Sequence, residues 1–254
     1  MSGRRPGTKC PWINALPLES LSPAAISFIA QVEQAYASLM QSAAARGEEN
    51  LGGKLLYAGE LDEPGRILAV AGNIAGAATL AGSAHRTALR QAMRSGAIDF
   101  LVTSLDEALR ILKNEIRKRQ PIAVGVSVPA EEMLRQMLDR GVLPDLLPPL
   151  LQSSPAPPEF AAFMARGAQR IAARPLQPGS KFLIWPIPAD FALRPAEFDA
   201  LLLKHVSPDD HAKRRWLRLS PRYLGPEARR FRSLACSTEI ASMLIDLLGP
   251  PLQP

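Results

Sequence analysis

A stretch rich in glycine and alanine ends in three polar residues that together could hold an anion. The stretch runs from Gly72 to Arg86, and the three residues are Ser83, His85 and Arg86. A hydroxyl, an imidazole and a guanidinium at the start of a helix could bind a phosphate group. The alternative is that Ser83 caps the next helix while Arg86 is solvated. The small residues themselves favour close packing of a helix against a strand.

Basic residues gather in a second candidate region nearer the carboxyl terminus. Residues 204–232 contain nine Lys or Arg against three Asp or Glu, with Trp216, Tyr223 and Phe231 interleaved. Basic and aromatic residues together are typical of nucleic-acid surfaces. The alternative is an amphipathic helix pair whose aromatic rings pack inward, and Leu217 beside Trp216 favours it. We therefore do not expect a nucleic-acid partner.

The overall composition indicates an ordinary folded chain with a basic balance. The chain has 254 residues, of which 47% are hydrophobic, and a formal net charge of +6. A chain of this size can bury a substantial core. Net positive charge favours contact with anions such as nucleotides but does not choose among them. Because no apolar run is long enough to cross a membrane, we expect a cytoplasmic protein with no membrane partner.

The cysteines and histidines give little support to metal or thiol chemistry. The sequence has two cysteines, Cys10 and Cys236, and three histidines. Their spacing fits no zinc site, so we expect no metal. Cys236 lies among leucines at helical spacing, and we interpret it as a buried helix residue and not as a nucleophile. Nothing beside Cys10 in the sequence marks a catalytic base.

The pattern of elements predicts an α/β fold with a mostly parallel sheet and helices on both faces. The expected strands are 54–60, 77–83, 122–127, 145–151 and 181–187. The expected helices begin at Ser22 and then cover 65–74, 85–95, 104–119 and 130–140. Ser22 and Ser104 are suited to cap two of these helices.

We expect one compact unit with a short leading arm. Residues 1–21 form the N-terminal arm, and residues 22–152 form the α/β domain with its leading helix. A proline-rich loop then begins with SSPAPPEF at 153–160. One further strand and a mainly helical region follow, so that residues 153–254 complete the same unit.

From Leu51 to Leu147, the order of segments resembles the central dinucleotide-binding domain of urocanase, the urocanate hydratase of histidine degradation. The residues that carry the resemblance are LGGKLLYAGELDEPGRILAVAGNIAGAATLAGS, SGAID at 95–99, LDEAL at 105–109 and PIAVGVSVPAEEMLRQMLDRGVLPDLL at 121–147. The resemblance implies a Rossmann-like fold that binds its cofactor at the carboxyl ends of the strands. In that family, a tightly bound NAD acts as an electrophile toward the substrate imidazole. The family also implies a homo-oligomer, such as a homodimer.

The first family motif is largely replaced in this chain. Where the family has a glycine-rich turn after the first strand, this chain has EPGRIL, which keeps only Gly65, and Gly59 lies just ahead in the strand. Glu63 places a carboxylate where phosphate charge would lie. Pro64 lacks the N–H group that a phosphate would use. Both residues oppose pyrophosphate binding in the manner of the family.

The later motifs are changed as well. Ser83 replaces the family's acidic residue after the second strand, and with His85 and Arg86 it could receive the 2′-phosphate of NADP. After the third strand only Ala130 agrees with the family, and no segment matches its catalytic cysteine. We assign no catalytic residue. The candidate cofactor-binding residues are Gly59, Gly65, Ser83, His85, Arg86 and Ala130.

These departures from the family determine the functional expectation. Because so many site residues are missing, we do not expect urocanate hydratase activity. The sequence favours a diverged nucleotide- or small-anion-binding protein, with NAD or NADP as candidate cofactors through the resemblance. The alternative is a non-catalytic scaffold or interaction protein, a pseudoenzyme with a vestigial cleft. A shared fold does not transfer function when the site residues differ.

Overall fold

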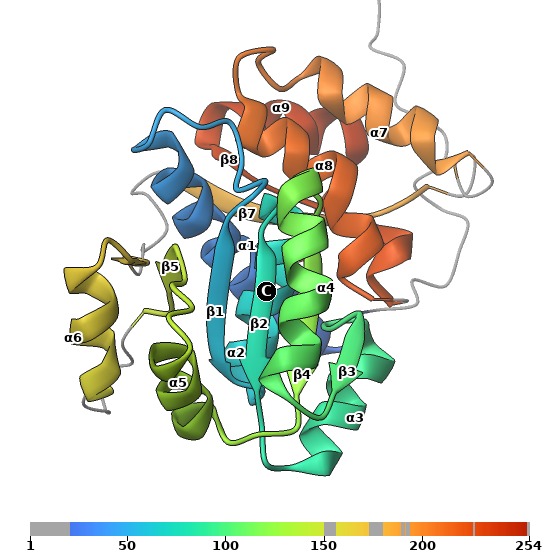
Figure 1. Cartoon of the computed structure of the whole chain (residues 1–254). Coiled ribbons are helices and arrows are strands. Elements are labelled where there is room, and N and C mark those ends of the chain that lie inside the picture. Colours follow the sequence, from blue (N-terminus) through green and yellow to red (C-terminus); the bar gives the residue numbers. More distant parts are fainter. Residues whose placement is uncertain are drawn as a thin grey trace, which may run out of the picture.

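A parallel sheet forms the centre of the molecule (Figure 1). The computed structural model describes residues 21–149, 156–172, 180–188, 191, 194–225 and 227–252. Within these residues the sheet has six strands, β1 (Leu55–Glu60), β2 (Ala78–Gly82), β3 (Phe100–Val102), β4 (Ile122–Val126), β5 (Leu146–Leu147) and β6 (Gln169–Arg170). Their order is β3-β4-β2-β1-β5-β6, and every neighbouring pair is parallel. The predicted Rossmann-like α/β fold is confirmed.

The direction in which strands are added reverses beside β1. The next strand, β2, pairs with one side of β1, and β5 pairs with the other side through Leu56 and Leu146. In open α/β sheets, such a reversal leaves a crevice at the carboxyl ends of the two strands, because the segments that follow them diverge to opposite faces. The fold therefore predicts a ligand site at the ends of β1 and β5.

Helices cover both faces of the sheet, and the strand sequences explain which side chains meet them. Along β1, Leu56 and Ala58 pack in the cluster that contains α1 (Pro23–Ala44) and α2 (Glu63–Ala75). The alternate residues Leu55 and Tyr57 pack in the cluster that contains α4 (Leu105–Lys118), α5 (Ala130–Asp139) and α6 (Pro158–Ala165). Alternation of side chains along a strand produces these two layers.

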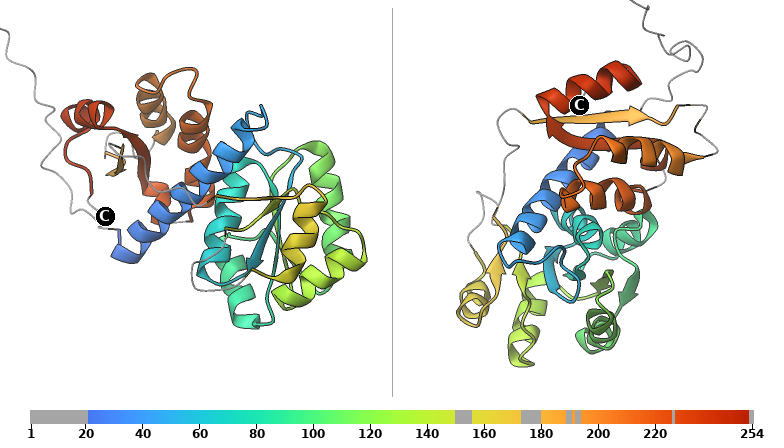
Figure 2. Two further views of the ribbon diagram at one scale, coloured as in Figure 1. Left: turned by 90° about the vertical axis from the view of Figure 1, so that its left-hand side faces the viewer. Right: turned by 90° about the horizontal axis from the view of Figure 1, so that it is seen from above.

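The C-terminal elements pack on the α1 side of the sheet. They are β7 (Ser180–Pro186), α7 (Pro195–Lys204), α8 (His211–Tyr223), the 3₁₀ turn η2 (Glu227–Arg230), β8 (Phe231–Ser237) and α9 (Thr238–Leu248). Figure 2 shows α1 between the sheet and these elements. The Arg215 guanidinium of α8 donates a 2.6 Å hydrogen bond to the Ile74 carbonyl of α2. Trp185 and Trp216 share one hydrophobic cluster with Val32 of α1, so the two regions have a common core.

The glycine- and alanine-rich stretch joins α2 to β2. A Cβ atom on Gly72 would lie 2.6 Å from the Thr79 Oγ1 and 2.9 Å from the Leu56 Cδ2. Only a residue without a side chain allows this approach of helix to sheet. Gly76 ends the helix in the left-handed region, with φ of 98°. The stretch is therefore scaffold, as its small residues predict, and α3 (Arg86–Ser95) begins after β2.

The strand β8 is the main difference from the predicted elements. Helical spacing of leucines predicted a helix around Cys236, but Phe231–Ser237 is a strand that pairs antiparallel with β7, and α9 starts only at Thr238. Cys236 is buried, as expected, although in a strand. Phe231–Ser237 forms a strand because it pairs with β7, and these cross-strand contacts override the short helical pattern of its leucines. The strand predicted at 145–151 is shorter, since Pro148 and Pro149 follow β5 and residues 150–151 lie outside the described residues.

The described residues contain neither a membrane-spanning helix nor a cluster of metal-ligating side chains. No helix there has both the length and the apolar character needed to cross a membrane. In the same part of the chain, no three His, Cys, Asp or Glu residues come together as a metal site.

Candidate functional site

A pocket of about 500 Å³ lies at the carboxyl ends of β1 and β5, where the fold predicts a crevice. We call it the switch-point pocket. It is lined by α1, the end of β1, the first turns of α2 and α5, and the segments that follow β5 and β6. Its volume is within the range of small-molecule sites. The predicted residues Gly59, Gly65 and Ala130 all line it.

Tyr57 joins two walls of the switch-point pocket. Its hydroxyl donates a 2.8 Å hydrogen bond to the Ala130 carbonyl at the start of α5, and its side chain is 1% exposed. Burial, with a smaller contribution from Glu60, raises the pKa of Tyr57 well above its usual value. The hydroxyl therefore stays protonated near neutral pH and holds α5 against β1.

Gly59 shapes the floor of the pocket through its backbone. It has a φ of 83°, and the register between β1 and β2 shifts between Tyr57 and Gly59. This bulge turns the end of β1 so that Gly59 and Glu60 both line the pocket. Glycine adopts the left-handed conformation without strain, whereas a residue with a side chain would be strained there.

The first turn of α2 does not fit the pyrophosphate of a dinucleotide. The Asp62 carboxylate caps this helix by accepting a 2.9 Å hydrogen bond from the Gly65 N–H. Pro64 has no N–H, and Glu63 adds a carboxylate to the same turn. Helix N-termini bind phosphate through free N–H groups and positive potential. In α2 the Gly65 N–H is already bonded to Asp62 and Pro64 has no N–H to donate. The carboxylates of Asp62 and Glu63 also make this turn negative.

Gly65 is required for the packing of α2 against the end of β1. A Cβ atom on Gly65 would lie 1.8 Å from the Glu60 carbonyl oxygen. The backbone of α2 therefore approaches the end of β1 too closely for any side chain. The single glycine that the chain shares with the family's turn is explained by this contact.

Carboxylates give the switch-point pocket its charge. Glu60, Asp62 and Glu131 line it, and its described lining includes no Lys or Arg. The rest of the wall is largely apolar, with Ile67, Leu68, Leu134, Phe160 and several prolines. An apolar pocket with an acidic rim favours an uncharged or cationic ligand.

Ser83, His85 and Arg86 lie apart from this pocket, at the end of β2. Ser83 is fully buried, and its hydroxyl accepts a 3.1 Å hydrogen bond from the His85 N–H. The prediction that Ser83 caps α3 is wrong, because His85 is the N-cap residue and gives no side-chain cap. Both His85 and Arg86 are exposed. The end of β2 is next to that of β1, since the Leu61 N–H donates a 3.0 Å hydrogen bond to the Gly82 carbonyl.

A match to a known family covers five of the six strands of the sheet and most of α1. Residues 31–150 match the family model described as the urocanase Rossmann-like domain. The chain carries a urocanase Rossmann-like domain. This urocanase domain begins within α1 and includes every strand from β1 to β5. The resemblance noted from Leu51 to Leu147 is confirmed, and the matched region also includes α1 from residue 31 onward.

The sequence prediction missed the acidic rim of the urocanase domain's pocket. Glu60 and Asp62 lie in GELDEPG, at and just after the end of an apolar strand. The carboxyl end of a strand is where ligands bind in this fold, so acidic residues there were the available signal. Glu131 could not be placed in advance, because its position depends on how α5 packs beside β1.

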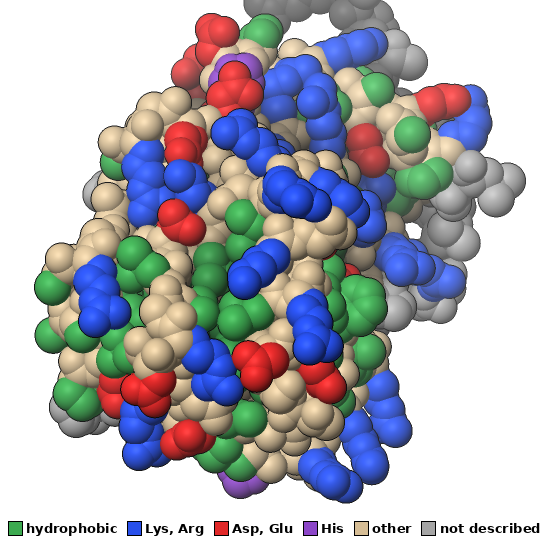
Figure 3. Space-filling model, viewed as in Figure 1, with side chains coloured by type: hydrophobic (Ala, Val, Ile, Leu, Met, Phe, Trp, Pro, Cys, Tyr) green, Lys and Arg blue, Asp and Glu red, His purple; other side chains and the backbone are tan. Residues whose placement is uncertain are grey.

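The basic segment 204–232 is largely explained by packing. Trp216 and Phe231 are buried, as the inward-packing alternative requires. The expected helix pair is wrong in its second half, because Phe231 begins the strand β8. Arg214 donates hydrogen bonds of 2.9 and 3.0 Å to the Leu203 and Val206 carbonyls. Lys and Arg side chains still gather on the face drawn in Figure 3, over the part of the molecule where α8 lies in Figure 1.

Proposed function

We propose that this urocanase-related chain binds a small ring-bearing molecule without a pyrophosphate, such as a nucleoside, in the switch-point pocket. The observation that carries the proposal is the combination of an apolar pocket at the strand ends with an acidic, already capped first turn of α2. A nucleoside offers a flat ring for the apolar wall. Its ribose hydroxyls and exocyclic amines are hydrogen-bond donors for carboxylates.

Glu60 and Asp62 are the proposed acceptors for such donors. Glu60 is half-buried at the end of β1, and Asp62 is exposed at the N-cap of α2. An ionised carboxylate accepts hydrogen bonds from hydroxyl groups more strongly than a neutral acceptor does. The same carboxylates repel phosphate, so the rim selects for ligands that lack it.

The NAD that the family resemblance implies does not fit the residues present. Its pyrophosphate would meet Glu63, Pro64 and the Asp62 carboxylate. We therefore propose no hydratase step through NAD, and the proposed function is binding.

A second candidate is an anion at the start of α3. This helix has no side-chain cap and no acidic residue in its first turn, and Arg86 is its first residue. His85 and Arg86 are both exposed and available to an anion. A nucleotide phosphate bound there would lie beside β2 and avoid the first turn of α2. We therefore propose the start of α3 as the site for a nucleotide phosphate or another small anion.

A thermal-shift panel tests both candidates. The panel contains adenosine, cytidine, nicotinamide riboside, AMP, NAD, NADP, urocanate and inorganic phosphate. A ligand at about 100 times its dissociation constant adds roughly 2.7 kcal/mol of stability, which raises the Tm by several degrees for a chain of this size. We expect a nucleoside to shift the Tm, and NAD and urocanate not to.

A matched pair of substitutions on α1 locates the site. Ala35 lines the switch-point pocket, whereas Ala37, two residues later, lines a different cavity. Ala35→Phe should abolish the nucleoside shift, and Ala37→Phe should preserve it. Arg86→Ala should remove any response to phosphate or AMP and leave the nucleoside response intact. Silence across the whole panel would contradict both candidates and favour the scaffold alternative with a vestigial cleft.

A further inference from the structure

A pocket of about 340 Å³ lies where the ends of three helices meet beside α2. The start of α1, the end of α3 and the end of α8 line it together with two residues of α2. We call it the helix-end pocket. Among the described residues it shares no lining residue with the switch-point pocket, although α1 and α2 contribute to both. It is therefore a separate candidate site.

Most of the helix-end pocket is walled by apolar side chains. Ile29 of α1 and Val70 of α2 are buried. Phe28 of α1 and Leu224 at the end of α8 are only half-buried, so they keep part of their surface open. Such walls take up the apolar part of a small ligand.

Arg66 is the one charged side chain in the described lining of the helix-end pocket. It is half-buried, and within the described part of the chain its guanidinium has neither an ion pair nor a hydrogen bond. A guanidinium binds a carboxylate through two parallel N–H···O bonds. The charged group that this pocket offers to a ligand is thus cationic and available.

Tyr223 adds a neutral hydroxyl to the same pocket. Its side chain is half-buried, and its hydroxyl has no hydrogen-bond partner among the described residues. Burial raises the pKa of Tyr223 above its usual value, against the opposing charge of Arg222. The hydroxyl therefore stays protonated near neutral pH and can donate to an anion. The Arg222 guanidinium carbon lies 5.2 Å from the centroid of the Tyr223 ring, which brings a second positive charge beside this wall.

The negative groups near the helix-end pocket are bonded or balanced. Asp99, whose charge also acts on Tyr223, accepts a 2.8 Å hydrogen bond from the Ala123 N–H and is outside the described lining. The ends of α3 and α8 bring the negative ends of two helix dipoles, and the start of α1 brings a positive end with no acidic residue in its first turn. Because these helix ends act in opposite directions, the Arg66 guanidinium decides the charge preference of the pocket.

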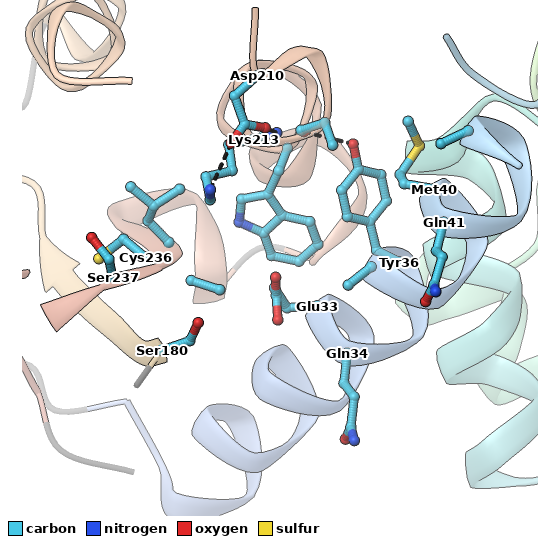
Figure 4. Close-up of a pocket in the computed structure, with 16 residues that line it drawn as sticks. Glu33, Gln34, Tyr36, Met40, Gln41, Ser180, Asp210, Lys213, Cys236 and Ser237 are labelled. Atoms are coloured by element: carbon cyan, nitrogen blue, oxygen red, sulfur yellow. Dashed lines mark hydrogen bonds and ion pairs between the residues drawn. The ribbon is translucent and has the colours of Figure 1, made fainter. Parts of the chain in front are cut away.

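The cavity drawn in Figure 4 differs in this respect. It lies between α1, α8 and the end of β8. There the ammonium group of Lys213 forms a 2.6 Å ion pair with Asp210, and the Tyr36 hydroxyl donates a 2.7 Å hydrogen bond to the Ala212 carbonyl. Its basic side chain thus already has an acidic partner, which Arg66 lacks among the described residues.

We propose that the helix-end pocket binds a small carboxylate with an apolar tail, such as hexanoate. The carboxylate pairs with Arg66 and accepts a hydrogen bond from Tyr223, and the tail packs against Phe28 and Leu224. One free guanidinium balances one negative charge, so a monoanionic carboxylate fits better than a phosphate dianion. The site is distinct from the anion candidate at Arg86, because Arg86 begins α3 and the helix-end pocket lies at the other end of that helix.

A pair of probes that differ in charge tests the chemistry. Hexanoate and hexanamide have nearly the same shape, but only hexanoate is an anion. Binding to the full chain is followed in ¹H–¹⁵N spectra through the backbone signal of Gly225, which lines the helix-end pocket. The signal of Gly59, which lines the switch-point pocket, is the internal control. We expect hexanoate to shift the Gly225 signal in a saturable way, and hexanamide to bind roughly tenfold more weakly because it lacks the charge-assisted bonds.

Two matched pairs of substitutions locate the site. Arg66→Gln should weaken hexanoate binding about tenfold, whereas Arg90→Gln makes the same charge change at an exposed position outside the pocket and should leave binding unchanged. Ala25→Phe should abolish binding by filling the helix-end pocket. Ala35→Phe, on the same helix but in the switch-point pocket, should have no effect on hexanoate.

The outcomes separate this inference from the proposed nucleoside site. Weaker hexanoate binding in Arg66→Gln, with an unchanged Tm and a preserved nucleoside response, would support it whether or not Ala25→Phe folds. Four results would overturn it: no saturable shift of the Gly225 signal at millimolar hexanoate, equal binding of hexanoate and hexanamide, unchanged affinity in Arg66→Gln, or displacement of hexanoate by inorganic phosphate at the same concentration.

Discussion

The Tyr57 hydroxyl and the Ala130 carbonyl are joined by a 2.8 Å hydrogen bond across 73 residues of chain. The bond connects β1 to the first turn of α5, and both elements line the switch-point pocket. Because Tyr57 is buried, neither partner can exchange this bond for water without opening the pocket.

Tyr57→Phe should therefore destabilise the protein. Removing the hydroxyl leaves the Ala130 carbonyl without its partner, and we expect a loss of about 1–3 kcal/mol in the free energy of unfolding. Chemical denaturation measures it. Tyr223→Phe is the matched control, because Tyr223 is only half-buried. An equal effect of the two substitutions would show that the Tyr57 bond has no special role.

Gly65→Ala should be among the most damaging single substitutions in the chain. The added Cβ atom would lie 1.8 Å from the Glu60 carbonyl oxygen, so α2 would have to move away from β1. We expect a cost of more than about 4 kcal/mol or a failure to fold. Gly96→Ala is the comparison, since Gly96 has a positive φ but open space around it. It should cost only about 1 kcal/mol. Thermal unfolding of the two variants measures the difference.

Glu63→Gln should improve the binding of phosphate-bearing ligands. The substitution removes one negative charge from the first turn of α2 and leaves the Asp62 cap in place. Charges near a helix terminus contribute about 0.3–1 kcal/mol, so we expect affinity for AMP to rise roughly two- to fivefold. Titration calorimetry of the wild type and the variant tests this. Unchanged affinity would show that charge at this turn does not decide against phosphate.

Glu107 should give α4 a pH-dependent cap. Hydrogen bonds from the Thr103 backbone N–H, at 2.9 Å, and from its hydroxyl lower the pKa of Glu107 below its usual value of 4.5. The stabilisation by the charged form is thus present above pH 4.5 and is lost as the pH falls through the lowered pKa. Glu107→Gln should be less stable than the wild type at pH 7, and the difference should vanish in acid. A difference independent of pH would contradict this account.

Much of the sheet could be predicted from the sequence, because buried parallel strands are continuous apolar runs. The prediction of 122–127 corresponds to Ile122–Val126, and Ser22 and Ser104 cap α1 and α4 as expected. The edge strand β3 was missed, since its Phe100 and Leu101 are exposed and lack a buried pattern. Helical spacing misplaced Cys236 because only pairing with β7 makes Phe231–Ser237 a strand.

The candidate site was predicted in part. Gly59, Gly65 and Ala130 line one pocket because they lie at strand ends or helix starts at the same edge of the sheet. Ser83, His85 and Arg86 follow β2 and lie outside it. A second pocket, between α1, α8 and the end of β8, had no sequence signal, since its walls come from residues about 200 positions apart in the chain.

That residues 153–254 complete one compact unit with the urocanase domain stays a prediction. The shared hydrophobic cluster of Val32 and Trp216 favours it. A single cooperative unfolding transition followed by both far-ultraviolet circular dichroism and tryptophan fluorescence would agree with it. Two separated transitions would contradict it.

The comparison of adenosine with AMP tests the central claim most directly, because the two ligands differ only in a phosphate. Calorimetric titrations of the wild type and of Ala35→Phe would give their dissociation constants for the switch-point pocket. We predict that adenosine binds more tightly than AMP and that Ala35→Phe abolishes its binding. Tighter binding of AMP through the same pocket, lost in Ala35→Phe and retained in Arg86→Ala, would contradict the claim that the acidic rim excludes phosphate.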